Sequence, residues 1–196
     1  MYRIALILAL ALFAASCGGR RSRPQQTACV SQPRVFLPAI APARLSPQEQ
    51  RDYLRWHYWD RFDFADTLFV READTAQMVE AYARWVALIS DRPADAAPMD
   101  SLMRRASASR PMLDYFTMLA QQVIHDPNSP LRNDEFYIPV MQAVLASPYY
   151  DEYERIGPAY DLAMASQNRL GQRANDFRYT TADGATRRMD DIRAEY

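Results

Sequence analysis

The strongest constraint on the fold is a series of amphipathic segments with helical spacing, separated by proline and glycine. The run Ser46-Pro47-Gln48-Glu49 has the pattern of a capping box with proline at the first helical position. It predicts a helix from Pro47 to about Phe64. Asp74 is expected to cap a second helix, in which apolar residues recur at three- and four-residue steps before Arg92-Pro93 ends it.

Three further helical segments are expected downstream. Residues 100–125 form one segment that Pro111 interrupts, so that it gives two pieces or a kink. Asn133 is expected to cap a segment that runs to Ser147. Residues 151–170 form the last segment, with Gly157-Pro158 midway and Gly171 after its end.

The pattern changes after Gly171. Residues 176–180 alternate between polar and apolar, Ala182-Asp183-Gly184 has the composition of a hairpin turn, and residues 185–189 can return as a second strand. The expected fold class is therefore mainly α, a compact bundle of five to six helices over residues 46–170 followed by a short C-terminal β-hairpin. An isolated hairpin is marginally stable at best, so this strand pair requires a sheet that the chain itself does not contain.

The N-terminus has the features of an export signal. A short positive start precedes twelve consecutive apolar residues, 4–15, which are too few to span a bilayer but fit a signal-peptide core. Cys17 follows Ala14-Ala15-Ser16, which resembles the lipobox of bacterial lipoproteins, although Ala14 stands where leucine is preferred. The resemblance implies that residues 1–16 are removed and that Cys17 is lipidated. We expect a lipid-anchored cell-envelope protein, on the outer membrane and facing the periplasm; a plain secretory signal is the alternative.

Residues 17–45 are expected to form a linker rich in proline and arginine. Its second cysteine, Cys29, is a possible free thiol, and the simpler interpretation is an incidental surface cysteine. Residues 18–45 carry five arginines and no acidic residue, whereas residues 51–196 carry 17 arginines against 23 acidic residues. An acidic body argues against nucleic acid as a partner.

The C-terminal tail resembles a known family. Residues 171–184, Gly-Gln-Arg-Ala-Asn-Asp-Phe-Arg-Tyr-Thr-Thr-Ala-Asp-Gly, are similar to the opening of thioredoxin-like domains of peroxiredoxins and membrane-anchored thiol-disulfide oxidoreductases. Asn175 stands in place of the usual proline, and residues 192–196 replace the usual turn. The resemblance implies that residues 171–196 are the incomplete beginning of such a domain, whose Cys-x-x-Cys site would lie beyond residue 196.

The helical body resembles a second family. Residues 57–64 and 126–140 are similar to an uncharacterised helical domain, a family of unknown function that precedes thioredoxin-like domains in exported bacterial lipoproteins. This resemblance covers about residues 48–170 and implies an architecture without an activity. It implies a thioredoxin-like domain in cis as a partner if the native chain is longer; the alternative is a natively short product.

Candidate binding residues lie on the first helix. The candidates are Trp56, His57 and Trp59. The two tryptophans and Tyr58 could stack against a glycan or a peptide, and core packing is the alternative for most aromatic residues of this stretch. His57 also lies at three-residue steps from Asp60 and Asp63, which could suggest metal or acid–base chemistry or ordinary pairing with Arg55 and Arg61. His125-Asp126, followed by Pro-Asn-Ser-Pro, is interpreted as a helix stop and a structured turn.

The residue inventory excludes several classes. Two cysteines and two histidines exclude a disulfide scaffold and the usual zinc sites, and neither a Gly-x-Ser-x-Gly motif nor a glycine-rich phosphate loop is present. We therefore expect no catalytic residue, metal or cofactor in this chain. The favoured hypothesis is a non-catalytic module that attaches to the membrane through its lipid anchor, is associated with a thioredoxin-like domain, and tethers that domain or positions an unknown client protein. A glycan- or peptide-binding protein is the alternative, and an enzyme built on His57 or His125 ranks third.

Overall fold

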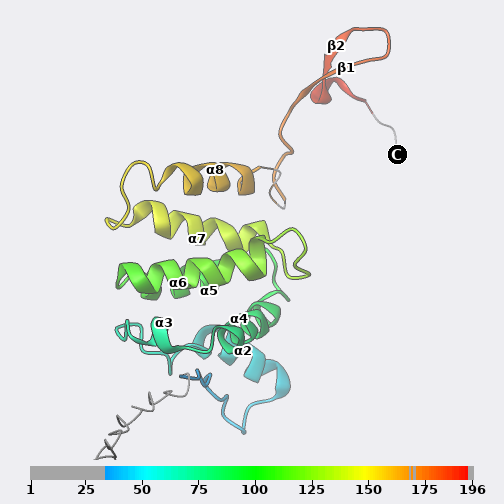
Figure 1. Cartoon of the computed structure of the whole chain (residues 1–196). Coiled ribbons are helices and arrows are strands. Elements are labelled where there is room, and N and C mark those ends of the chain that lie inside the picture. Colours follow the sequence, from blue (N-terminus) through cyan, green and yellow to red (C-terminus); the bar gives the residue numbers. More distant parts are fainter. Residues whose placement is uncertain (1–33, 168, 170, 194–196) are drawn as a thin grey trace, which may run out of the picture. The chain divides into compact units, whose positions relative to one another are not determined.

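The computed structural model describes residues 34–167, 169 and 171–193, and confirms a mainly helical fold with a C-terminal hairpin (Figure 1). Residues 1–16, which are expected to be a signal peptide, and both cysteines, Cys17 and Cys29, lie outside the described residues. The α-helices are α2 (Pro47–His57), α3 (Phe69–Glu72), α4 (Thr75–Ile89), α5 (Ala97–Ala106), α6 (Arg110–Ala120), α7 (Asp134–Ala146) and α8 (Ile156–Ala165). A π-helical turn (Gln121–His125) follows α6, strands β1 (Arg178–Thr180) and β2 (Thr186–Arg188) form the hairpin, and a 3-10 turn (Met189–Asp191) follows β2.

The expected caps begin three of these helices. The Ser46 hydroxyl accepts a hydrogen bond from the Glu49 amide, and the Glu49 carboxylate accepts one from the Ser46 amide at 2.8 Å, which completes the capping box of α2. Asp74 accepts from the amide of Gln77 at the start of α4. Asn133 does the same for α7, so all three expected N-caps are confirmed.

The first helix is shorter than its sequence predicts. It ends at His57 instead of about Phe64, and turns bonded from Asp60 to His57 and from Phe62 to Trp59 continue the chain. The aromatic residues of this stretch cannot all face one side of a helix. Because the turns change the direction of the chain, all four aromatic residues after His57 can be buried: Tyr58, Trp59, Phe62 and Phe64.

Proline and glycine divide the later segments. Pro111 lies in the first turn of α6, so the expected segment 100–125 is two helices and a π-helical turn. In the same way Gly157-Pro158 lies at the start of α8, which begins at Ile156 instead of residue 151. Pro139 lies inside α7, where it is buried.

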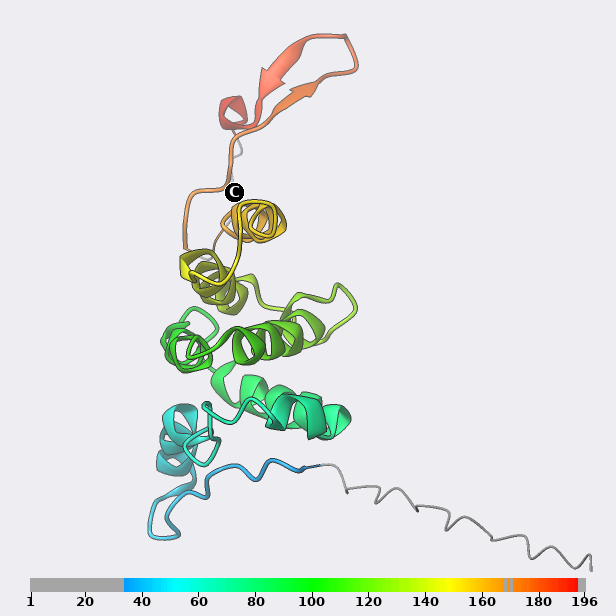
Figure 2. The same ribbon diagram turned by 60° about the vertical axis from the view of Figure 1, so that its left-hand side comes forward.

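The helices share one hydrophobic core (Figures 1 and 2). Helix α4 packs against α2, α6 and the π-helical turn, and α7 packs against α5, α6 and α8. An aromatic cluster joins them: Phe116 of α6 contacts Trp59, Phe62 and Phe64, with ring centroids 5.3–5.4 Å apart. Edge-to-face contacts dominate this cluster, as the quadrupoles of the rings favour.

The end of the expected linker belongs to this core. Arg34 exchanges backbone hydrogen bonds with Glu72 and Asp74, and the ring of Phe36 stacks on Trp59 with centroids 4.7 Å apart. Gln77 bonds both backbone groups of Phe36 through its side-chain amide. From Arg34 onward the segment 17–45 therefore packs against the helices.

The hairpin has the expected turn. Strands β1 and β2 pair antiparallel, with Tyr179 opposite Arg187. Gly184 has a φ of 83°, a conformation that glycine adopts without strain. No helix among the described residues is long and apolar enough to cross a membrane.

Candidate functional site

The structure separates the three aromatic residues expected to bind a ligand. Trp56 is 49% exposed and the His57 side chain is 45% exposed, whereas Trp59 is 3% exposed in the aromatic cluster. The separation arises because Trp59 follows the end of α2, where the chain turns toward the core. Only Trp56 and His57 are available at the surface, and the Tyr53 ring stacks on His57 at 4.3 Å.

His57 takes part in a chain of polar contacts. Its Nδ1 lies 2.7 Å from one oxygen of Asp60, and the other oxygen of Asp60 accepts from Arg105 at 3.1 Å. Arg105 also donates to the carbonyl of Trp59. Asp63 does not join this chain, because its carboxylate accepts from the backbone amide of Ala65. The contacts hold the turn after α2 onto α5, and no group of three potential metal ligands forms within the described part of the chain.

The second histidine packs against an aromatic ring. His125 ends the π-helical turn, and its ring stacks on Tyr137 with centroids 4.1 Å apart. Asp126 accepts from the amide of Asn128, so it closes the following turn instead of orienting the imidazole. Burial raises the pKa of Tyr137 to about 12, which keeps its hydroxyl protonated. This arrangement agrees with a helix stop followed by a structured turn.

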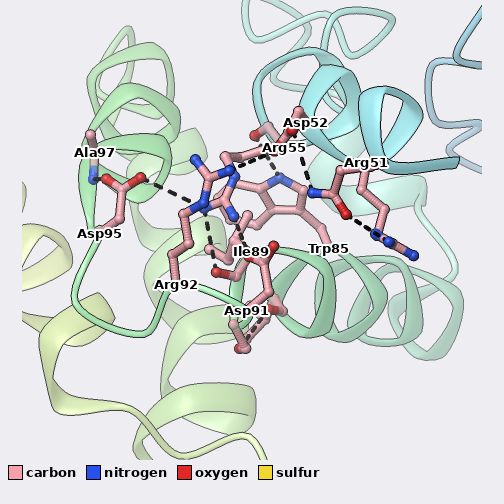
Figure 3. Close-up of polar contacts among 12 residues, drawn as sticks. Arg51, Asp52, Arg55, Trp85, Ile89, Asp91, Arg92, Asp95 and Ala97 are labelled. Atoms are coloured by element: carbon pink, nitrogen blue, oxygen red, sulfur yellow. Dashed lines mark hydrogen bonds and ion pairs between the residues drawn. The ribbon is translucent and has the colours of Figure 1, made fainter. Parts of the chain in front are cut away.

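A buried arginine is the feature that the sequence reasoning missed (Figure 3). The sequence suggests that Arg55 is a surface partner of the nearby acids, but its side chain is 2% exposed. Its guanidinium forms an ion pair with Asp91, lies 3.7 Å from the carboxylate of Asp95, and donates to the carbonyl of Ile89. Its spacing could have indicated burial, because Arg55 precedes buried Tyr58 by three residues and buried Trp59 by four.

The Arg55 cluster connects α2 to the end of α4. The indole of Trp85 donates to the carbonyl of Arg55 at 3.2 Å, and Arg92 pairs with Asp52 at 3.0 Å (Figure 3). The two carboxylates that face Arg55 remain 41% and 37% exposed, so solvent reaches them but not the guanidinium of Arg55. This geometry supports a structural clamp between elements distant in sequence.

Two hollows open on the surface of the helical unit. The first, of about 270 Å³, is lined by the residues Arg34, Val35, Phe36, Leu37, Arg61, Phe62, Asp63, Asp66 and Phe69. The second, of about 360 Å³, lies between α5 and α7 and is lined by Asp100, Arg104, Ser107, Gln142, Ala143, Ala146, Ser147 and Pro148. In the first, Arg34 pairs with Asp66 at 2.5 Å; in the second, Arg104 pairs with Asp100 at 2.7 Å. Each hollow thus contains an ion pair between two of its own lining residues.

The C-terminal hairpin presents its own surface. Two ion pairs, Arg173 with Asp190 and Arg188 with Asp176, hold the strands to the flanking segments. Phe177 and Ile192 are both more than half exposed. Large apolar side chains next to two short strands are typical of an edge that pairs with more sheet.

Comparison with solved structures finds a similar protein. The chain is similar to the crystal structure of a thioredoxin-like protein from Bacteroides caccae ATCC 43185, with 33% sequence identity and a TM-score of 0.70. The match covers 82% of this chain and 58% of that one, so the chain spans little more than half of that protein's length. Comparison with curated proteins finds no match.

The helical unit also matches a family model. Residues 16–168 match the model described as a domain of unknown function (DUF5106), and this range contains α2–α8. The match confirms the resemblance of the body to an uncharacterised domain associated with thioredoxin-like folds. The chain therefore belongs to the DUF5106 family.

Proposed function

We propose that the helical unit is a non-catalytic module of a lipid-anchored envelope protein, where it carries a thioredoxin-like thiol-disulfide redox domain and positions that domain's clients. The observation that supports this most is the β1–β2 hairpin, which follows a helical unit similar to part of a thioredoxin-like protein. A two-stranded hairpin is marginal alone, and thioredoxin-like domains supply a sheet that it can join. The chain's two cysteines, Cys17 and Cys29, do not form a Cys-x-x-Cys pair.

The test compares two proteins in a disulfide-reduction assay. Residues 1–196 should not turn over a disulfide substrate with dithiothreitol or thioredoxin reductase as electron source. The native product, purified from its own cells, should have an intact mass above 22.5 kDa by the mass of a further domain, and should reduce the substrate. Turnover by residues 1–196, or a native mass that fits this chain alone with its acyl groups, would contradict the proposal.

The membrane anchor is part of the proposal and has its own test. If Cys17 is acylated, Cys17→Ser should move the protein from the membrane fraction to the soluble periplasmic fraction, because the acyl chains supply the anchoring. Cys29→Ser is the matched control and should leave the protein in the membrane fraction. Equal distribution of the two variants would argue for a plain secretory signal.

Recognition of a glycan or peptide by α2 is the second candidate. The observation that favours it is the half-exposed Trp56 next to the stacked rings of Tyr53 and His57. Titration with a panel of soluble oligosaccharides and peptides should then give a saturable change in tryptophan fluorescence that Trp56→Ala removes. Titrations that leave the fluorescence unchanged would reject this candidate.

A further inference from the structure

Helix α8 is apolar on the side that faces away from the core. Tyr153, Ile156, Tyr160 and Met164 are 82%, 63%, 64% and 43% exposed. The last three are spaced by four residues and so lie along one face of the helix, and Tyr153 lies in the turn before it. We call these four residues the α8 stripe. Single exposed apolar residues are normal on protein surfaces, but a contiguous row marks an interaction site.

The rest of α8 explains why the stripe remains uncovered. Leu162 and Ala165 pack against the core, and Asp161 accepts a hydrogen bond from Tyr137 of α7. Asp161 is the only charged residue within α8, and the hydrogen bond from Tyr137 engages its carboxylate. In Figures 1 and 2, α8 is the last helix of the layered stack and has α7 on one side.

We propose that the α8 stripe is the docking surface for the thioredoxin-like domain that continues this chain. This inference rests on the proposed function and specifies where the two domains touch. The stripe is directly followed by residues 166–177, which lead to β1, so the stripe and the hairpin are close along the chain. Phe177 and Ile192 of the hairpin segment are exposed as well, which gives the incoming domain apolar contacts on both elements.

The length of the structural neighbour agrees with such an occupant. The matched part, 82% of 196 residues, is about 160 residues, and it represents 58% of the neighbour. The neighbour therefore has about 280 residues, of which about 120 lie outside the match, enough for one domain of ordinary size. That protein is described as thioredoxin-like.

The charges around the stripe favour a protein domain over a membrane surface. Helices that lie on membranes combine an apolar face with lysine or arginine that contacts anionic lipids. The nearest arginines are engaged elsewhere: Arg155 donates to the carbonyl of Ser147 at 2.7 Å, and Arg169 pairs with Glu135 at 2.6 Å.

The experiment is hydroxyl-radical footprinting of two samples, residues 1–196 and the native product from its own cells. Tyr153, Tyr160 and Met164 should be oxidised several-fold more slowly in the native product, because the docked domain covers them. Trp56 is the matched internal control: its exposure of 49% is close to the 43% of Met164, and its rate should be equal in both samples.

Each outcome has a defined meaning. Equal oxidation of the stripe in both samples, in a native product that is heavier than this chain, overturns the docking surface and leaves the proposed function intact. A native mass that matches residues 1–196 overturns both. Protection of the stripe in residues 1–196 that increases with protein concentration assigns the surface to a second copy and also overturns the inference.

A pair of variants of the longer native chain provides the second test. The double variant Tyr160→Arg, Met164→Arg should restore the oxidation rate of Tyr153 to that found in residues 1–196, because two charges prevent docking. Ile40→Arg is the matched control, since Ile40 is 82% exposed and lies on the N-terminal segment; it should leave Tyr153 protected. A protected Tyr153 in the double variant would overturn the inference.

Discussion

Helices α4 and α8 are both rich in apolar residues, yet they use them in opposite ways. Helix α4 buries six side chains, including Met78, Tyr82 and Trp85, against three neighbouring elements. Helix α8 fully buries only Ala165, packs Leu162 partly against the core, and leaves Ile156, Tyr160 and Met164 exposed. Similar apolar content therefore gives full burial in α4, which three elements surround, and partial burial in α8, which packs against α7.

The largest expected effect is a difference in the free energy of unfolding between a variant of α4 and a variant of α8. Trp85→Ala removes a side chain that is 1% exposed, and we expect a loss of about 3–5 kcal/mol in the free energy of unfolding. Tyr160→Ala, at 64% exposure, should change it by no more than about 0.5 kcal/mol. Urea denaturation of both variants measures the difference. Equal losses would mean that α8 is packed as tightly as α4.

The clamp at the end of α4 should give the next largest effect. The double variant Asp91→Ala, Asp95→Ala leaves the Arg55 charge buried without its carboxylates, which should cost about 3 kcal/mol. The control is Glu80→Ala on the same helix, where the pair with Arg84 is exposed and contributes at most about 1 kcal/mol. Thermal denaturation of both variants tests this, and a double variant as stable as the control would show that the clamp does not stabilise the fold.

The rate of amide hydrogen exchange should also differ between α4 and α8. Amides in the middle of α4 should exchange with solvent only when the whole unit unfolds, because every turn of that helix has buried side chains. Amides of α8 should exchange faster by an order of magnitude or more, since one side of the helix has no cover. Hydrogen exchange followed by mass spectrometry distinguishes these rates. Similar protection in both helices would contradict the expectation.

The smallest effect concerns pH. A hydrogen bond from Arg110, which begins α6, lowers the pKa of Glu154 in the turn before α8 below its ordinary value of 4.5. The pair therefore stabilises the fold above about pH 4.5, and this contribution is lost as the pH falls through the lowered pKa of the folded state. Carboxyl groups titrate between about pH 5 and pH 3. Over this range, Glu154→Gln should slightly reduce the fall in the free energy of unfolding. Urea midpoints measured across that range provide the test, and an unchanged slope would count against it.

Sequence reasoning predicted the features that depend on local chemistry. Ser46, Asp74 and Asn133 cap helices because each side chain bonds an amide three residues away, and the glycine of the hairpin turn has the positive φ that its position requires. Both family resemblances depended on short runs of residues, and the family model confirms the larger one.

Features that depend on distant contacts were not predicted. Arg55 is buried because the connection between α4 and α5 supplies its carboxylates from 36 and 40 residues away in the chain. Trp59 is buried although Trp56 is exposed, and this depends on the turns after His57. These turns bring Trp59 into an aromatic cluster that includes Phe116. The exposed side of α8 could not be predicted either, because its sequence is apolar on several sides and does not indicate which side is covered.

The π-helical turn Gln121–His125 has a consequence for the tolerance of the chain to insertions and deletions. Its backbone bond from Asp126 to Gln121 encloses one more residue than an α-helical bond would. Deleting one residue here would remove this extra residue and restore α-helical geometry, while the chain after the turn keeps its orientation. A deletion in the regular part of α6 would instead rotate the following chain by about 100° and break the backbone bond from Asn133 to Ile124. Among natural relatives of this chain, a one-residue deletion should therefore be tolerated in this turn and rare in the regular part of α6.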